Sequence, residues 1–194
     1  MSFNYNGGGA AFYDIPIVQP DGTAPEAAVA DQCVVAFEPT AGAFNAITVA
    51  NQPDVPRNVT FGVVDANSSI TSAAAVIVGT DYQDRSLQET ISFPGGGTDT
   101  IIGLLCFKTI DESKSYIAVA GVVTGGMDTV QLGYGNAFGT PLQIASVDDV
   151  TNRRVDNTTG VGSISVANQS WDVTANPPDG AKMYFISIHS SASG

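Results

Sequence analysis

The sequence predicts an all-β protein, an antiparallel β-sandwich or β-barrel of about ten strands with an extended N-terminal arm. Charged residues make up only 13% of the 194 residues, about half the usual share of ~25%. The solvent-facing sides of helices usually carry Lys, Glu and Arg, so their scarcity argues against an all-α protein. The 21 glycines and the abundance of Val, Thr, Ser and Asn favour strands and tight turns. A hydrophobic content of 43% is enough to fill a core, which argues against disorder.

Residues 1–32 differ from the rest and are predicted to form the arm, followed by a β-rich domain at residues 33–194. They contain no Lys or Arg, and their three prolines and the glycine run 7–9 disfavour central strands. Either this terminus packs on its own domain or frays, or it lies on a neighbouring subunit. In the second case we expect the apolar residues of the arm to form the interface: Phe3, Tyr5, Phe12, Tyr13, Ile15 and Ile17.

From residue 33 onward, short apolar or alternating segments separated by turn residues predict strands. The alternation is clearest at 58–64 and 87–93, where apolar residues occupy every second position except that of Glu89. Residues 136–160 show no such pattern and are predicted to be a long loop, while 25–30 allow one short helix that begins with proline. In chain order the predicted strands are 33–37, 44–50, 58–64, 74–80, 87–93, 101–110, 116–123, 128–134, 161–166, 171–174 and 183–188.

The formal net charge of −12 limits the possible partners. Seven Lys and Arg residues cannot neutralise a run of phosphates, which argues against nucleic acid as the main partner. No window holds 18 uninterrupted apolar residues, and the first residues lack the basic start and apolar core of a signal peptide, so we expect neither a membrane span nor secretion. Cys33 and Cys106 lie in apolar runs, which predicts buried free thiols of a protein made in a reducing cytoplasm; a disulfide between them is the alternative.

No residue pattern predicts a catalytic centre, a metal site or a bound cofactor. His189, the single histidine, falls at the end of a predicted strand on the face opposite its apolar residues, so we expect it to be solvated. The acidic clusters at 81–84 and 148–149 lack the alternating ligands and distal glutamate of a calcium loop. Gly133 and Gly135 do not form a phosphate-binding loop, because no helix follows them.

Glu89 is the carboxylate with the least ordinary position. It shares one face of its predicted strand with apolar residues, where burial would raise its pKa unless it were paired. We expect a salt bridge to Lys108 or Arg85, or a position at the edge of a sheet.

A series of segments occurs in order across residues 53–145, at 56–60, 78–81, 88–92, 106–110 and 128–139. It resembles β-sandwich structural proteins of tailed-bacteriophage virions, particularly the head decoration (cement) proteins. The resemblance implies a non-enzymatic particle component, often a homotrimer, that is made in the host cytoplasm. It would bind the capsid surface of the assembled head and stabilise it by bridging subunits of the major capsid protein.

Two other kinds of function stay open. A phage tail-tube or head–tail connector protein would form rings, with 136–160 as a stacking loop; the acidic charge suits both a capsid exterior and a tube that DNA passes through. A carbohydrate-binding or adhesin module would need an exposed aromatic patch. The candidate side chains for such a patch are Tyr82, Tyr116, Tyr134, Tyr184 and Trp171.

Overall fold

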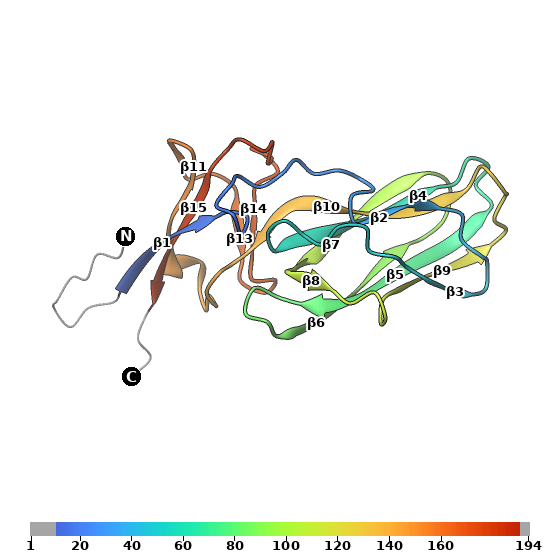
Figure 1. The fold of residues 1–194 in the computed structure, drawn as a ribbon, viewed down its shortest axis with the longest axis horizontal. Helices are drawn as coiled ribbons and strands as arrows, with labels where there is room; N and C mark the ends of the chain where they lie inside the picture. Colours follow the sequence, from blue (N-terminus) through green and yellow to red (C-terminus); the bar gives the residue numbers. More distant parts are fainter. Residues whose placement is uncertain (1–10, 191–194) are drawn as a thin grey trace.

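The computed structural model describes residues 11–190, which form fifteen strands and no α-helix in an elongated molecule of two lobes (Figure 1). The prediction of an all-β, antiparallel fold is confirmed. In chain order the elements are β1 (Ala11–Ile17), β2 (Val34–Phe37), β3 (Phe44–Ala46), β4 (Arg57–Val64), β5 (Ile70–Thr80), β6 (Ser86–Phe93), β7 (Asp99–Phe107), β8 (Thr109–Ile110), β9 (Tyr116–Gly121), β10 (Thr129–Gly139), the 3-10 turn η1 (Val147–Asp149), β11 (Val150–Val155), β12 (Thr158–Thr159), β13 (Ser163–Ser165), β14 (Ser170–Asp172) and β15 (Tyr184–Ser190).

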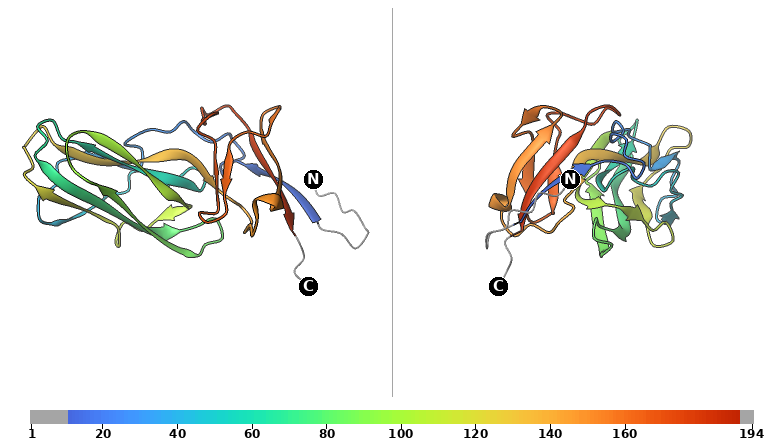
Figure 2. Two further views of the ribbon diagram at one scale, coloured as in Figure 1. Left: turned by 180° about the vertical axis from the view of Figure 1, so that it is seen from behind. Right: turned by 60° about the vertical axis from the view of Figure 1, so that its left-hand side comes forward.

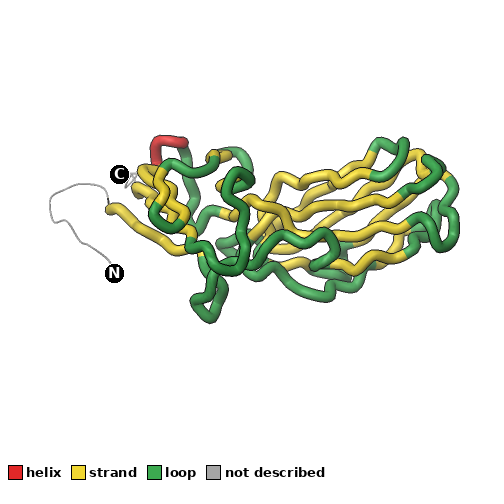
Figure 3. Tube along the Cα trace, turned by 90° about the horizontal axis from the view of Figure 1, so that it is seen from above, coloured by secondary structure: helices red, strands yellow, loops and turns green. Residues whose placement is uncertain are grey.

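The larger lobe, here called the sandwich lobe, consists of two antiparallel sheets that face each other. The β10 sheet has the order β13-β14-β10-β4-β7, with β2 also paired to β10; its strands β13 and β14 extend into the smaller lobe and pack in the core of that lobe. The β5 sheet has the order β3-β9-β5-β6, with β8 also paired to β5. Their strands run along the long axis of the molecule (Figure 3).

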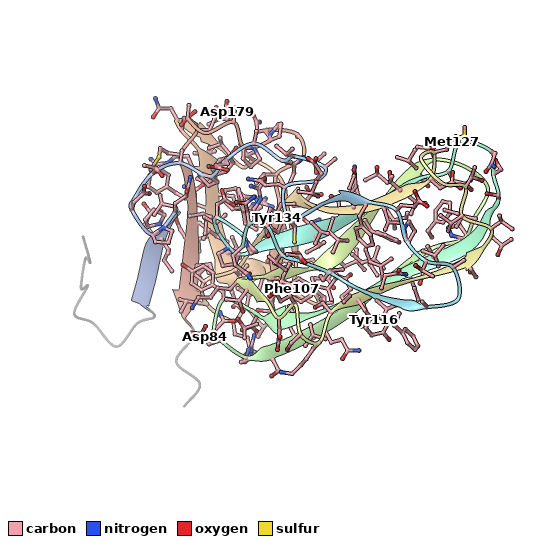
Figure 4. All side chains as sticks on the ribbon, turned by 45° about the vertical axis from the view of Figure 1, so that its right-hand side comes forward. Asp84, Phe107, Tyr116, Met127, Tyr134 and Asp179 are labelled. Carbon is pink, nitrogen blue, oxygen red and sulfur yellow. The ribbon has the colours of Figure 1, made fainter. Side chains whose placement is uncertain are left out.

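The alternation in the sequence explains how the sandwich lobe is filled. Val59, Phe61 and Val63 of β4 are fully buried, and from the opposite sheet Ile91 and Phe93 of β6 are also buried. Inward-facing residues at every second position of both sheets thus form one continuous core, as in other sandwiches. Figure 4 shows Phe107 between the two sheets.

The smaller lobe, here called the end lobe, is built around a third sheet with the order β1-β15-β11-β12. It has its own core, in which Phe138, Trp171 and Tyr184 pack edge to face with ring centroids 4.9–6.3 Å apart. The polar atoms of two of these rings are satisfied, because the Trp171 indole donates to the Val161 carbonyl (2.9 Å) and the Tyr184 hydroxyl to the Asn176 carbonyl (2.9 Å). The views in Figure 2 show this lobe at one end of the sandwich lobe.

The prediction of a loop at 136–160 is wrong. These residues contain the end of β10, the turn η1, and strands β11 and β12. Strand β11 shows no alternation in its sequence because only Val155 of its six residues is buried. Its Arg154 guanidinium lies over the Phe185 ring, 4.3 Å from the ring centroid. An arginine therefore covers an aromatic ring that an aliphatic side chain would be expected to cover, and the strand lacks the apolar residue that sequence alternation requires.

The predicted arm is partly built into the subunit. Residues 11–17 form β1, which pairs along its whole length with β15 of the same chain. Strand β1 lies at the edge of its sheet, where Pro16 is tolerated because no ladder partner needs its missing N–H. Residues 25–30 adopt no regular secondary structure, so the helix that the sequence allowed there is absent.

Strand β10 connects the two lobes, because its first half packs in the sandwich core and Phe138, near its end, packs in the end-lobe core. The β4–β10 register shifts between these halves. Arg57, fully buried, stabilises the backbone there: its Nε and Nη2 donate to the Gly135 carbonyl at 3.1 and 2.9 Å, and its Nη1 donates to the Glu26 carbonyl (2.9 Å) and to Asp54 (3.1 Å). One guanidinium thereby joins the chain segment before β4 to the strand shared by both lobes.

Asn58, the next residue, holds the same region from the other face of β4. Its amide nitrogen donates to the Gly103 carbonyl of β7 (2.9 Å), and its amide oxygen accepts from the Ala137 N–H of β10 (2.9 Å). The side chain lies directly against Gly135, where any Cβ would overlap it. The glycine therefore leaves room for the asparagine to bridge two strands whose direct pairing with β4 is interrupted.

Replacing Arg57 by methionine tests this junction. The substitution keeps most of the volume but leaves two carbonyls and the Asp54 carboxylate without their donor, so we expect a loss of about 3–5 kcal/mol in the free energy of unfolding, measured by urea denaturation. Arg85→Met is the control, because Arg85 is half exposed in its pair with Asp81 and should cost at most about 1 kcal/mol. Equal losses for the two variants would contradict the role assigned to Arg57.

Candidate interaction surfaces

The groups most able to carry chemistry are dispersed over the fold. Across residues 11–190, no three His, Cys, Asp or Glu side chains come close enough together to hold a metal ion. His189 lies in β15 opposite Phe12 of β1, and its side chain is outside the described part of the structure. The same residues contain no helix of the length and hydropathy that a bilayer crossing requires.

Glu89 occupies an edge position, as expected, but its partner is not a basic side chain. Strand β6 is the edge of its sheet, and the Glu89 carboxylate accepts hydrogen bonds from the backbone N–H groups of Leu104 (2.6 Å) and Leu105 (3.2 Å) on β7, the edge of the opposite sheet. The predicted salt bridge is wrong, because Lys108 pairs with Asp84 and Arg85 with Asp81.

The Glu89 carboxylate thus closes one side of the sandwich by joining its two sheets. Burial raises the pKa of the Glu89 carboxyl above its ordinary value of 4.5, and the two backbone hydrogen bonds only partly offset that rise. It also covers two N–H groups of an edge strand, which would otherwise be open to pairing with another chain. The sequence signal for this role was a carboxylate on the apolar face of an amphipathic strand.

Two buried aspartates fix the loops at the far tip of the sandwich lobe, and sequence reasoning did not single them out. Asp65 accepts from the backbone N–H groups of Ser69 (3.0 Å) and Ile70 (3.1 Å). Asp128 accepts from the N–H groups of Ala66 (3.3 Å) and Thr124 (2.7 Å). Each carboxylate accepts hydrogen bonds from backbone N–H groups of a turn that would otherwise be made to water. These hydrogen bonds account for the burial of the two carboxylates without a paired cation.

Both cysteines are free and buried, as predicted. Burial raises the pKa of the Cys33 thiol to about 11, against a smaller opposing effect of its hydrogen bond with Tyr134. Burial also raises the pKa of the Cys106 thiol, with the Glu89 charge as a second cause. Neither sulfur is therefore suited to act as a nucleophile at neutral pH.

Charged side chains are concentrated in the loops. Within residues 11–190, the charged residues that do lie in strands are Asp14, Arg57, Glu89, Asp99, Arg153, Arg154 and Asp172. Among the four main strands of the β5 sheet this leaves only Glu89, which lies on the inner side with Ile91 and Phe93.

The outer side of the β5 sheet is consequently free of charge; we call it the neutral face. It consists mainly of small side chains and forms a shallow hollow of about 500 Å³. At its margin Phe44 is 78% exposed, and its ring packs edge to face on Tyr116 with centroids 4.9 Å apart. The residues that line the hollow include Phe44, Ser72, Ala74, Ser92, Ala118 and Ala120.

A second hollow, here called the junction groove, lies on the outer side of the β10 sheet where the two lobes meet. Its volume is about 440 Å³, and its walls come from the segment 28–30, from β7, β4 and β10, and from β13 and β14 of the end lobe. Ile102 and Leu104 of β7 line it and are 65% and 62% exposed, and Val29 is 47% exposed. Large apolar side chains from two separate segments therefore gather in one concave place.

The junction groove exists because the chain crosses β10 closely. A Cβ at Gly133 would overlap the backbone of Val29 and Ala30, so glycine alone lets this segment lie on the strand and form one wall. The segment is held in place through Glu26, whose carbonyl binds Arg57 and whose N–H donates to Asp54 (2.7 Å). The buried ion pair at the junction thus also positions the groove.

The six predicted interface residues fall into three groups. Phe3 and Tyr5 lie outside the described residues, and Phe12 and Tyr13 lie in β1 with side chains that are not described. Ile15 is half-buried, and Ile17 is buried in the end-lobe core of the same chain. Ile17 is therefore a core residue of its own subunit, and an interface with a neighbour would have to use the others.

Comparison with known proteins gives no relative. No family model, no curated protein and no solved structure matches this chain. Functional inference therefore depends on the surfaces described above.

The state of the cysteines is directly testable. With both sulfurs buried and their pKa values raised, a thiol reagent such as Ellman's reagent should label the native protein slowly at pH 8. In urea it should label two thiols per chain at once. Rapid stoichiometric labelling of the native protein would contradict the burial of the two side chains.

The raised pKa of Glu89 predicts a pH dependence of stability. In the pH range just above 4.5 the folded protein binds this proton more tightly than the unfolded chain, so the contribution of Glu89 to stability falls as the pH rises through that range. Glu89→Gln does not titrate. We therefore expect urea denaturation to show wild type losing stability relative to Glu89→Gln between pH 4 and pH 7, and a difference that is constant or changes in the opposite sense would contradict the assignment.

Proposed function

We propose that this protein is a non-enzymatic structural component of a virus particle, a capsid decoration protein that binds the assembled head and bridges its subunits. The observation that carries the proposal is the separation of charge from the sheet surfaces. A chain with a net charge of −12 presents a whole sheet face without a charged side chain. The resemblance of residues 53–145 to decoration proteins supplies the kind of particle.

Acidic loops combined with an uncharged sheet face suit a protein that associates through that face alone. Acidic loops repel other copies and other acidic molecules, which opposes random self-association. A neutral, shallow face of small side chains can meet another surface without removing charges from water, which is the costly part of burying a polar surface. A stable contact needs about 1,200–2,000 Å² in total, and a broad sheet face is a direct way to provide area.

The two other functions left open by the sequence have less support. The tail-tube or connector function drew on a long stacking loop at 136–160, where the chain forms strands instead. The carbohydrate-binding function drew on exposed aromatic rings, but Tyr134, Tyr184 and Trp171 are buried. Decoration of a shell requires neither feature.

The mass of the purified protein, measured by light scattering, tests this proposal. We expect a small closed oligomer, with a trimer as the state typical of decoration proteins. A hexamer or an open polymer would favour a tube, and a monomer would contradict the proposal as stated.

Substitution on the neutral face tests its role. Phe44→Glu places a charge on the face, so we expect it to weaken association at least tenfold in the concentration dependence of the light-scattering mass. Met127→Glu is the control, because Met127 is also exposed but lies at the far tip of the sandwich lobe (Figure 4). An equal effect of both substitutions would argue that overall charge, and not the neutral face, controls association.

A further inference from the structure

We infer that the junction groove binds residues 1–10 of a second copy of this chain, with Phe3 and Tyr5 against the exposed side chains of Ile102 and Leu104. The inference rests on the proposed function only in requiring that copies associate. It assigns to the aromatic residues of the N-terminal segment a receiving site that the sequence could not show.

The groove has the surface of a binding site that is not filled from within the described chain. Ile102 and Leu104 point outward from β7 and are 65% and 62% exposed, although Cys106 and Phe107 of the same strand are buried. Val29 faces the same space from the segment that crosses β10. Large apolar side chains in a concave site are the usual anchor points of a recognised peptide.

A second, independent feature of the groove is an unpaired acceptor. Asn136 of β10 lines the groove, and its side-chain oxygen is buried without a hydrogen-bond partner among the described residues. Buried polar atoms in native proteins almost always have a partner. A backbone N–H of a bound peptide would supply the donor that this oxygen lacks, whereas a purely apolar ligand would not.

Residues 1–10 have the composition that this groove requires. They contain no charged side chain, although the chain as a whole is strongly acidic. Phe3 and Tyr5 are two positions apart, so in an extended segment both rings lie on one side, while Asn4 and Asn6 lie on the other. A segment with paired aromatic residues and no charged side chain brings no side-chain charge into an apolar groove.

The position of β1 indicates a neighbouring subunit as the receiver. Strand β1 pairs with β15 from Ala11 to Ile17. It begins at the end of the molecule remote from the sandwich lobe (Figure 1). The preceding ten residues can span at most about 33–36 Å from that point. The described chain therefore begins at the outer end of the end lobe, whereas its own groove lies on the inner side of this lobe, and for this reason we assign the receiving groove to another copy.

Disulfide trapping between two full-length variants tests the inference. One variant carries Tyr5→Cys and the other Ile102→Cys; they are mixed and oxidised mildly, and the mixed dimer is quantified on a non-reducing gel. The native cysteines do not interfere, because Cys33 and Cys106 are 0% and 4% exposed. Val122→Cys replaces Ile102→Cys in the control, since Val122 is equally exposed, at 65%, but is not among the residues that line the groove.

We expect at least a fivefold higher yield of the mixed dimer with Ile102→Cys than with Val122→Cys. Equal yields, or no dimer, would overturn the inference. A chain carrying both Tyr5→Cys and Ile102→Cys is then oxidised at high dilution: a fast intrachain disulfide would show that the segment folds back onto its own groove, and this outcome also overturns the inference.

Leu104→Asp provides a measurement that needs no added thiol. It places a charge in the groove, and we expect it to weaken association in light scattering as strongly as the double substitution of Phe3 and Tyr5 by serine. Combining all three changes should cause no further loss, because one contact is removed in either case. Association of the wild-type protein without the trapped dimer would refute the inference and leave the proposed function standing, whereas a wild-type monomer would refute the association that both require.

Discussion

The buried guanidinium of Arg57 is the interaction on which the arrangement of this molecule depends. It binds one carbonyl of β10 with two donors and the segment before β4 with a third, at the place where the regular pairing of β4 and β10 is interrupted. A buried cation is tolerated only when its hydrogen bonds and its counter-charge are provided, and Asp54 and the two carbonyls provide them. The path of the crossing segment, and with it one wall of the junction groove, is fixed by this cluster.

Charge placement is the second constraint, and it links composition to surface. The few charged residues are not spread evenly over the structure. Strands such as β5 and β9, whose side chains alternate between core and solvent, carry Ala, Ser, Thr and Val on the solvent side. The acidic side chains are then left to the loops, where several hydrogen-bond the local backbone, as Asp65 and Asp128 do. The result is a protein whose acidic loops repel other acidic surfaces, while the neutral face does not.

The sequence was sufficient for the fold class and for most strands of the sandwich lobe, because inward residues such as Val59, Phe61 and Val63 alternate without exception. It failed at β11, where a polar strand is held by a stacked arginine and by pairing with β15, both of which come from distant parts of the chain. For Glu89 it offered a salt bridge or an edge position, and only the edge position is right, because backbone donors on another strand leave no signature in a list of side chains. The junction groove was beyond prediction, since its walls come from segments that only the tertiary fold brings together.

The order of the lobes along the chain has a consequence for how this protein is assembled from parts. The end-lobe core takes Ile17 from β1 and Ile186 from β15, yet the whole of the sandwich core lies between them in sequence. The sandwich is thus a nested insertion inside a module whose first and last strands are neighbours, and the Asp14 carboxylate accepts a hydrogen bond from Ser187, 173 positions away. No single cut in the polypeptide separates the two modules.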